Sequence, residues 1–325
     1  MIVINCVNQW VHSTTNFIPS RAVMDFQPHV MSQANASETN NNAWTIGRLI
    51  NWTNQYLTEN GSESARLDTE ILLAKVLGCE RIMLYTRFDE DPGDQVRATF
   101  RNLVKERAAG CPVAYLVGHK EFFSLKFKVT KDTLIPRPDT EEAVQAILDL
   151  AKSKQADTST IADIGTGSGI LAITLAKELQ HSQFVASDIS EAALSVAQEN
   201  AHFHDVADRI QFRSGDLCNP LEGETFDVIV SNPPYVSDNE LAQCSPDVKD
   251  YEPLQALVSG PTGMEIYQRL IPEAKPLLNP SGWLVLETSP MLASGLKQLL
   301  EEYGYQSVNI KRDHTGNPRI VLGQV

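Results

Sequence analysis

Apolar residues recur with two different periods along this chain. Between residues 44 and 112 they repeat every three or four positions, which is typical of amphipathic helices. This stretch contains three apolar faces, made by Ile46, Leu49, Ile50, Thr53 and Leu57, then by Leu67, Ile71 and Leu72, and last by Val96, Phe100, Leu103 and Val104. Gly110 and Pro112 end the third face, as expected at the end of a helix. We therefore predict a small all-α domain over residues 44–112.

The remainder of the chain contains strand patterns. Residues 121–129 alternate between apolar and polar positions and predict a β-hairpin connector over residues 113–130, in which Phe122 and Phe123 either line a ligand pocket or pack in the core. From residue 131 to residue 325, short apolar runs alternate with helical stretches. The runs lie at residues 161–164, 184–187, 210–213, 226–230, 283–287, 306–311 and 319–322. This order predicts an α/β domain with a doubly wound, Rossmann-like sheet whose last two strands form an antiparallel edge.

The first 43 residues have a different composition. They are rich in Asn, Ser, Thr and Gln, carry almost no charge and show no helical period. A segment of this kind has too little apolar surface to offset the conformational entropy lost on folding. We predict a disordered N-terminal extension over residues 1–43.

Three alternating glycines follow the apolar run at residues 161–164. The segment consists of Gly165, Thr166, Gly167, Ser168 and Gly169, and a helical pattern begins at residue 170. Glycines permit positive φ and let a ligand approach the main chain where no Cβ stands in the way. The spacing differs from the dinucleotide fingerprint Gly-x-Gly-x-x-Gly, which argues against a nicotinamide cofactor. The next strand ends in Asp188, at the distance where an acidic residue in this architecture receives the two hydroxyls of a ribose.

The third strand of the predicted sheet leads into a second candidate contact. Residues 210–213 are followed by Ser-Gly and then by Asp216 and Leu217. Asp216 is placed to accept a hydrogen bond from an adenine amino group, and Leu217 to cover the ring. The alternative, that Asp216 is only a turn residue, stays open from the sequence.

A proline-rich motif ends the fourth strand. Asn232, Pro233, Pro234 and Tyr235 follow the apolar run at residues 226–230. Each proline restricts its own φ and the conformation of the residue before it, so the Asn232 side chain and the Pro233 carbonyl form a stiff pair of hydrogen-bond acceptors. Such a pair could hold an NH2 group, with Tyr235 packing on a flat amide or base. The alternative is a strand that ends in a proline turn.

Three further motifs accompany the glycine segment and the Asn-Pro-Pro-Tyr motif. They are residues 134–141 (Leu-Ile-Pro-Arg-Pro-Asp-Thr-Glu), residues 251–257 (Tyr-Glu-Pro-Leu-Gln-Ala-Leu) with Gly260 and Gly263, and residues 313–319 (Asp-His-Thr-Gly-Asn-Pro-Arg). With these motifs the chain, from about residue 44 to its end, resembles class I S-adenosylmethionine-dependent methyltransferases. More narrowly it resembles the HemK/PrmC family of protein-glutamine N5-methyltransferases. One departure is the stretch 286–290 (Leu-Glu-Thr-Ser-Pro), where relatives usually have a glycine soon after the glutamate.

The resemblance implies an enzyme that methylates the side-chain nitrogen (N5) of the glutamine in the Gly-Gly-Gln motif of class I peptide chain release factors, and so modulates translation termination. The donor is S-adenosyl-L-methionine and the product S-adenosyl-L-homocysteine. The expected catalytic residues are Asn232, Pro233 and Tyr235, and Pro234 joins them in binding the substrate. The cofactor is expected to contact Gly165, Thr166, Gly167, Ser168, Gly169, Asp188, Asp216, Leu217 and Asn232. The helical domain is expected to grip the release factor.

The amino-acid composition limits which kinds of partner and which setting are expected for this chain. With 41 acidic and 27 basic residues the net charge is −14 and the isoelectric point about 4.9, so direct binding to nucleic acid backbones is disfavoured and a basic protein partner is favoured. The five cysteines are scattered, which predicts a reducing, cytoplasmic setting and no metal site. No apolar run is long enough to predict a membrane helix. His202 and His204 do not share a helix face, and we expect both to be solvated.

Two alternatives remain from the sequence. An enzyme that methylates an exocyclic amino group of a DNA or RNA base needs the same Asn-Pro-Pro-aromatic motif, although the acidic charge argues against it. A binding module without catalytic activity is the second alternative. The intact glycine segment and the intact Asn-Pro-Pro-Tyr motif argue against that one.

Overall fold

The structure is a computed structural model that describes residues 44–154 and 158–325. The predicted disordered extension, residues 1–43, lies outside the described residues. The chain divides into two compact units, with the boundary between Ala108 and Ala109, and each unit is described by itself. No helix in the described ranges is long and apolar enough to cross a lipid bilayer.

The smaller unit is built from helices. They are α2 (Ile46–Glu59), α3 (Ala65–Leu77), α4 (Met83–Thr86) and α5 (Asp94–Ala108). The Thr45 hydroxyl caps α2 by accepting a hydrogen bond from the Arg48 backbone N–H at 3.3 Å. The face predicted for α2 is confirmed, since its five residues are all buried. The local apolar period was therefore sufficient to identify the packing side of this helix.

Helix α3 differs from its predicted face. Leu72 is buried as expected, but Leu67 is 42% exposed. Charged side chains take its place on the buried side, because Asp68 accepts a hydrogen bond from Arg107 of α5 at 2.7 Å and Glu70 pairs with Arg81 at 3.0 Å. These ion pairs join sequence-distant segments, so the period of apolar residues alone could not reveal them.

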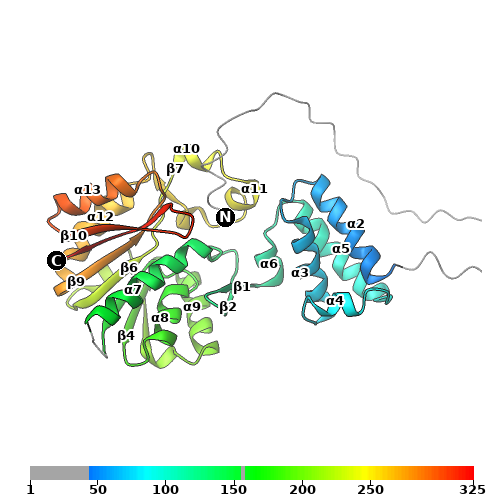
Figure 1. Ribbon diagram of the computed structural model, residues 1–325, viewed down its shortest axis with the longest axis horizontal. Coiled ribbons are helices and arrows are strands. Elements are labelled where there is room, and N and C mark those ends of the chain that lie inside the picture. Colours follow the sequence, from blue (N-terminus) through cyan, green and yellow to red (C-terminus); the bar gives the residue numbers. More distant parts are fainter. Residues whose placement is uncertain (1–43, 155–157) are drawn as a thin grey trace, which may run out of the picture. The chain divides into compact units, whose positions relative to one another are not determined.

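The larger unit contains a seven-stranded sheet with helices on both faces (Figure 1). Its strand order is β10-β11-β9-β6-β3-β4-β5. The strands are β3 (Thr160–Ile164), β4 (Gln183–Asp188), β5 (Ile210–Ser214), β6 (Phe226–Ser231), β9 (Leu278–Glu287), β10 (Gln306–Arg312) and β11 (Pro318–Gln324). β11 is antiparallel to both of its neighbours, whereas β3, β4, β5, β6 and β9 are parallel. The predicted doubly wound sheet with an antiparallel edge is confirmed.

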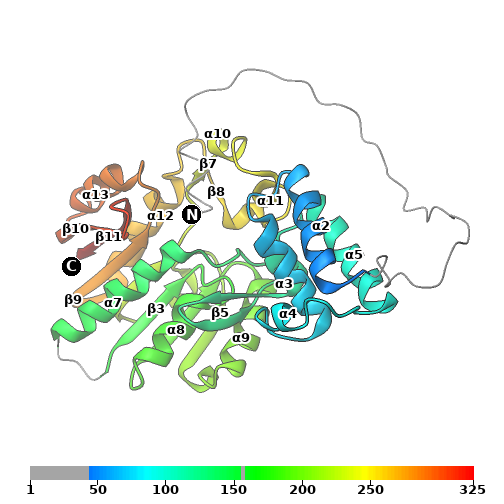
Figure 2. The ribbon, with the colours of Figure 1, turned by 45° about the vertical axis from the view of Figure 1, so that its right-hand side comes forward.

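Alternate residues of the central strands bury opposite faces of the sheet. Ile161 and Val230 belong to the core under α7 (Glu141–Lys154), α8 (Ile170–Glu178) and α9 (Glu191–Phe203). Ala162 and Ile229 belong to the core under α12 (Glu265–Ala274) and α13 (Ala293–Glu302). Figures 1 and 2 agree in placing α7 to α9 on one side of the sheet and α12 and α13 on the other. Because both faces are covered, the strands read as continuous apolar runs.

Several short elements complete the larger unit. They are α6 (Val113–Val117), β1 (His119–Phe122), β2 (Leu125–Lys128), the 3₁₀ turn η1 (Pro138–Thr140), β7 (Val236–Ser237), α10 (Asp238–Leu241), α11 (Pro246–Lys249) and β8 (Val258–Gly260). β1 and β2 form an antiparallel hairpin whose turn holds Phe123 and Ser124 at positive φ. Phe122 packs in the core under α7 to α9, with Phe123 against its edge, as the core alternative predicted.

The prediction for His204 was wrong. Its side chain is buried, 8% exposed, and its Nε2 lies 2.9 Å from the Lys126 carbonyl of the hairpin. The ring also contacts Phe127, with 5.1 Å between the two centroids. His202 is exposed, as expected. His204 closes α9 as its C-cap residue, and the hairpin packs over that end of the helix, so a helix-face argument did not apply.

Candidate active site

Strand register brings the predicted site residues to one edge of the sheet. Ile164 of β3 pairs with Ser187 of β4 and with Ser231 of β6. The glycine segment, Asp188 and Asn232 begin directly after these paired residues, and Asp188 itself pairs with Ser214 of β5. Carboxyl ends of parallel strands are where ligands bind in open α/β sheets. The structure thus brings three of the predicted contacts together.

The glycine segment forms a tight turn between β3 and α8. Gly165, Gly167 and Gly169 have φ of +72°, +57° and +85°. A Cβ at Gly165 or Gly167 would meet no atom within 4 Å, whereas one at Gly169 would lie 2.7 Å from the Ile173 side chain. The first two glycines therefore leave the main chain open to a ligand, and the third permits close packing of the helix. Ser168 is buried, and its carbonyl accepts from the Asn200 side chain at 2.8 Å.

Two carboxyl groups hold this turn in shape. Asp163 accepts hydrogen bonds from the Thr166 hydroxyl at 2.6 Å and from the Ala172 N–H at 3.1 Å. Its Oδ1 is buried and has no hydrogen-bond partner within the described part of the chain. Burial raises the pKa of Asp163 to about 6. Asp188 accepts from the Gly167 N–H at 2.8 Å, so the second strand positions the turn of the first.

Asp188 keeps its carboxylate at the sheet edge. Its second oxygen accepts from the Ser190 N–H at 2.9 Å. Burial raises the pKa of Asp188, and the backbone donors at Ser190 and Gly167 oppose that effect. The next residue, Ile189, is a large apolar side chain that remains 51% exposed. No sequence pattern singles out Ile189, although its place directly after the acidic residue could have marked it as a candidate for covering a bound ligand.

Asp216 and Leu217 follow β5 at the same edge. Asp216 pairs with Arg269 of α12 at 2.5 Å, which the sequence did not indicate. Leu217 lies in the left-handed region, with φ +47°, and packs against the core under α12 and α13. A leucine held at positive φ stores backbone strain, and such strain is concentrated at functional sites. Their contact with adenine stays a prediction.

The Asn-Pro-Pro-Tyr motif follows β6. Asn232 is partly exposed, and its Nδ2 donates to the Thr140 hydroxyl at 3.3 Å. Among residues 44–154 and 158–325, no donor hydrogen-bonds to Asn232 Oδ1 or to the Pro233 carbonyl. These two oxygens are the predicted acceptor pair, and they are called the acceptor pair below. The Tyr235 ring packs against the core under α12 and α13, and burial raises the pKa of its hydroxyl.

Glu287, at the end of β9, lies beside this motif. Ser231 pairs with Leu286, so Glu287 and Asn232 occupy corresponding positions on neighbouring strands. Glu287 is 1% exposed, and burial raises its pKa to about 7. The Thr140 and Tyr235 hydroxyls act to lower that pKa and oppose the effect of burial, while Glu287 Oε2 has no hydrogen-bond partner in the described part of the chain. From the sequence, residues 286–290 stood out only because they differ from the pattern of relatives.

A buried ion pair connects two of the sequence motifs. Arg137 pairs with Glu252 at 2.5 Å, with side-chain exposures of 9% and 1%. Glu252 also accepts from the Ile135 N–H at 3.0 Å. Burial raises the pKa of Glu252 in spite of the guanidinium. The segments at residues 134–141 and 251–257 are thereby held against each other, 115 positions apart in the chain.

Comparison with known proteins agrees with this architecture. Residues 48–118 match the model of the PrmC N-terminal domain, and residues 141–245 match the model of the methyltransferase small domain. The catalytic domain of hMettl16, solved in complex with an RNA hairpin, superposes with a TM-score of 0.52 and covers 68% of this chain and 81% of that chain. At 18% identity this likeness concerns the fold alone.

Curated relatives extend over nearly the whole chain. The release factor glutamine methyltransferase of Rhodopirellula baltica is 44% identical over 293 residues, which cover 89% of this chain and 99% of the relative. The protein of the same name from Geobacter sulfurreducens is 40% identical over 282 residues, covering 87% and 97%. Identity of this extent, together with the two domain matches, shows that the chain belongs to the release factor glutamine methyltransferase family.

Proposed function

We propose that this chain transfers a methyl group from S-adenosylmethionine to the side-chain amide nitrogen of a glutamine in a class I peptide chain release factor. The observation that carries the proposal is the register of β3 and β6. Because Ile164 pairs with Ser231, the open glycine turn and the acceptor pair extend from adjacent residues at one sheet edge. The methyl donor and the amide nitrogen that receives the methyl group can therefore meet at this edge. The proposed reaction takes place in the cytoplasm, where release factors act.

The residues at the glycine turn fit the cofactor. S-adenosylmethionine carries a cationic ammonium group, a cationic sulfonium, a ribose and an adenine. The buried, unpartnered Oδ1 of Asp163 and the open main chain at Gly165 and Gly167 suit its methionine part. Asp188 would hold the ribose hydroxyls, and the exposed apolar Ile189 would cover one face of the adenine. When bound, the cofactor supplies an electrophilic methyl group.

The acceptor pair solves the chemical difficulty of the substrate. An amide nitrogen is a poor nucleophile, since its lone pair is delocalised into the carbonyl. Asn232 Oδ1 and the Pro233 carbonyl would each accept one N–H of the glutamine and hold its nitrogen in place. As that nitrogen loses its planar character, positive charge builds up on it, and the two oxygens stabilise this charge more than the ground state. The surplus proton leaves to water.

Tyr235 and the prolines complete the substrate site in this proposal. The Tyr235 ring, packed against the core, would contact the flat carboxamide of the glutamine. Pro233 and Pro234 restrict the backbone, so the acceptor pair loses little conformational freedom when the substrate binds.

The charge of −14 favours a basic protein over a nucleic acid as the partner.

The test is mass spectrometry of a purified release factor incubated with the chain and S-adenosylmethionine. The expected result is a gain of one methyl group on a single glutamine. Methylation of RNA or DNA in a parallel incubation, with an unmodified release factor, would contradict the proposal and support the nucleic acid alternative. A release factor whose glutamine is replaced by alanine serves as the control.

A further inference from the structure

The orientation of the Asn232 carboxamide needs an explanation that the proline backbone does not provide. The oxygen and the NH2 group of this side chain are nearly equal in shape, but only the oxygen accepts a hydrogen bond. A half-turn about the last side-chain bond would present two N–H donors to the substrate nitrogen. The acceptor pair would then be lost. Some neighbour must therefore select one of the two orientations.

Thr140 is that neighbour. Its hydroxyl oxygen lies 3.3 Å from Asn232 Nδ2. Thr140 is fully buried, whereas Asn232 is partly exposed, so the contact is made on the inner side of Asn232. A hydroxyl could serve Asn232 as donor or as acceptor. Which role it plays depends on where its own proton goes.

The direction of this contact answers that question. Asn232 Nδ2 is the donor, so the Thr140 oxygen accepts and its own proton points away from Asn232. A buried carboxyl group, Glu287, is 1% exposed, and its Oε2 has no hydrogen-bond partner in the described chain. The Thr140 hydroxyl acts to lower the pKa of Glu287, against the effect of burial. The contact with Thr140 thus places the Asn232 NH2 group inward and leaves its oxygen outward.

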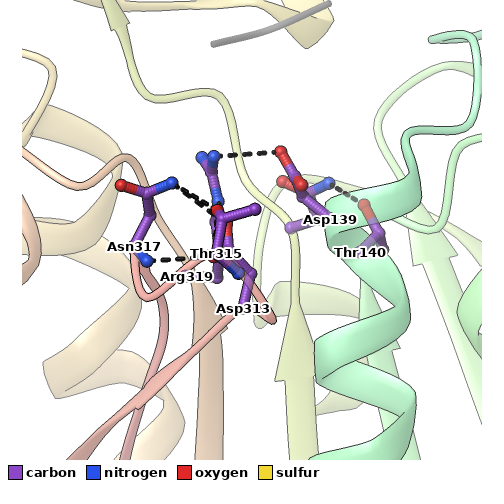
Figure 3. A network of polar contacts seen from close by, with 7 residues as sticks. Asp139, Thr140, Asp313, Thr315, Asn317 and Arg319 are labelled. Carbon is purple, nitrogen blue, oxygen red and sulfur yellow. Dashed lines mark hydrogen bonds and ion pairs between the residues drawn. The ribbon is translucent and has the colours of Figure 1, made fainter. Parts of the chain in front are cut away.

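An ion-pair network holds the segment that carries Thr140. Asp139, next to it in η1, lies 3.2 Å from Arg319 of β11, and the Arg319 Nε donates to Asp313 at 3.0 Å. Arg319 is 2% exposed and Asp313 6%. Figure 3 shows Asp139 and Thr140 side by side, with the Asp139 carboxylate towards the Arg319 guanidinium. We call Asp139, Arg319 and Asp313 the Arg319 network.

The turn between β10 and β11 fixes the far end of this network. Asp313 accepts from the Thr315 hydroxyl at 2.6 Å and from the Asn317 N–H at 2.9 Å (Figure 3). Burial acts to raise the pKa of Asp313, but the hydrogen bonds from Thr315, Asn317 and Arg319 outweigh it and hold the pKa below its usual value. The carboxylate is therefore ionised and available to Arg319. The motif at residues 313–319 therefore helps to hold the segment that carries Thr140.

We propose that Thr140 is a positioning residue, held by the Arg319 network, that turns the Asn232 carboxamide oxygen towards the substrate nitrogen. The inference rests on the proposed function, because it assigns the acceptor that Asn232 offers in that reaction. Thr140 acts through Asn232 and needs no contact with substrate or cofactor. The Thr140 hydroxyl orients Asn232, and the Thr140 methyl group takes no part in this.

Two pairs of variants isolate the hydroxyl. Thr140→Val replaces it by a methyl group of the same shape, and Thr140→Ser and Thr140→Ala differ from each other by the hydroxyl alone. In methylation of a purified release factor, we expect Thr140→Ser to keep most of the wild-type kcat. Thr140→Val and Thr140→Ala should lower kcat by about 10- to 100-fold, the scale of a misplaced catalytic contact. The dissociation constant of S-adenosylmethionine, measured by calorimetry, should not change.

A double-mutant cycle separates positioning from a structural role. In an Asn232→Ala background, Thr140→Val should cause no further loss, because the carboxamide it orients is gone. A general packing defect would lower activity in both backgrounds. Thr174→Val is the matched control, since Thr174 is equally buried and its hydroxyl has no partner in the described chain.

Two results would overturn the inference. One is a wild-type kcat in both variants that lack the hydroxyl, and the other is an equal loss from Thr140→Val with and without Asn232. If Thr140→Val fails to fold, the serine and alanine variants carry the same comparison. The wild-type chain in the same assay tests the proposed function separately, because it must methylate the release factor before any variant can be compared.

Discussion

The polar residues at the carboxyl edge of the sheet act at different stages of the proposed reaction. Asn232 Oδ1 and the Pro233 carbonyl oxygen accept no hydrogen bond from any described residue, so both can accept one from a substrate NH2 group. Asp188 is already occupied by backbone N–H groups and shapes the turn that would hold the cofactor. Substitutions at these positions should therefore separate chemistry from binding.

Asn232→Ala should lower methyl transfer by about 10²- to 10³-fold and leave cofactor binding nearly unchanged, because the lost acceptor matters most in the transition state. Calorimetry gives the dissociation constant and a methyl-transfer assay gives kcat. Asn239→Ala, an exposed asparagine in α10, is the control and should have no effect. Near-normal turnover of Asn232→Ala would remove Asn232 from the mechanism.

Asp188→Ala should show the opposite behaviour. Losing charge-assisted hydrogen bonds to the ribose is expected to raise the dissociation constant of S-adenosylmethionine by about 10- to 100-fold. Since Asp188 also holds the Gly167 N–H, part of this loss comes from a looser turn. The measurement is calorimetric titration with the cofactor, and Asp208→Ala, at an exposed position, is the comparison. An unchanged dissociation constant would mean that Asp188 is only a loop residue.

Glu287 should make stability depend on pH. Burial raises its folded-state pKa to about 7 from 4.5, so the folded protein holds a proton that the unfolded chain has lost between these values. The free energy of unfolding therefore falls as pH rises from 4.5 to about 7. Glu287→Gln removes this contribution, which amounts to about 3 kcal/mol for a fully buried group. Denaturant titrations at pH 5 and pH 8 should show a smaller pH-dependent loss in the variant; equal losses in both proteins would contradict it.

Elements with a long apolar run were predictable, and short polar elements were not. Each predicted strand of the sheet is present, because two covered faces require continuous apolar residues. β9 begins at Leu278, five residues before its predicted start, since its first half is polar. The strands between β6 and α12 were not predicted either, because they are too short to form an apolar run: β7 has two residues and β8 three.

The candidate site was predictable only in its local motifs. Asn232, Asp188 and the glycine turn each follow an apolar strand, which is a pattern within a few residues. Thr140 and Glu287 lie far from Asn232 in the chain. The pairing of β6 with β9 brings Glu287 to it, and the turn η1 brings Thr140. Local sequence patterns therefore pointed to the residues that directly follow the strands, whereas they could not identify Thr140 and Glu287.

Gly263 tests how one turn supports another. It has φ +81°, and a Cβ there would lie 2.6 Å from the Tyr235 carbonyl oxygen. Gly263→Ala should displace the backbone after the acceptor pair and lower kcat, as well as stability by more than the 1–2 kcal/mol or so expected from positive φ alone. Gly61→Ala is matched in conformation, with φ +85° and nothing within 4 Å. It should lose about 1–2 kcal/mol of stability and no activity; equal behaviour of the two variants would rule out the contact.

At the scale of the whole molecule, net charge decides which partners approach quickly. An excess of 14 acidic charges repels phosphate backbones and attracts a basic surface, and release factors that work against ribosomal RNA are expected to present one. Such attraction raises the association rate more than it slows dissociation. It also weakens with salt, because the screening length falls from about 30 Å at 0.01 M to about 8 Å at 0.15 M.

The apparent kcat/KM for a release factor should therefore fall as ionic strength rises from about 0.01 M to about 0.5 M, by about 10-fold or more. Stopped-flow measurement of association over the same range locates the effect in the encounter step. Cofactor binding is the internal control, since S-adenosylmethionine is small and contacts a turn positioned by buried groups, and its dissociation constant should change much less. An association rate that stays constant with salt would show that shape complementarity, not charge, brings the substrate to the enzyme.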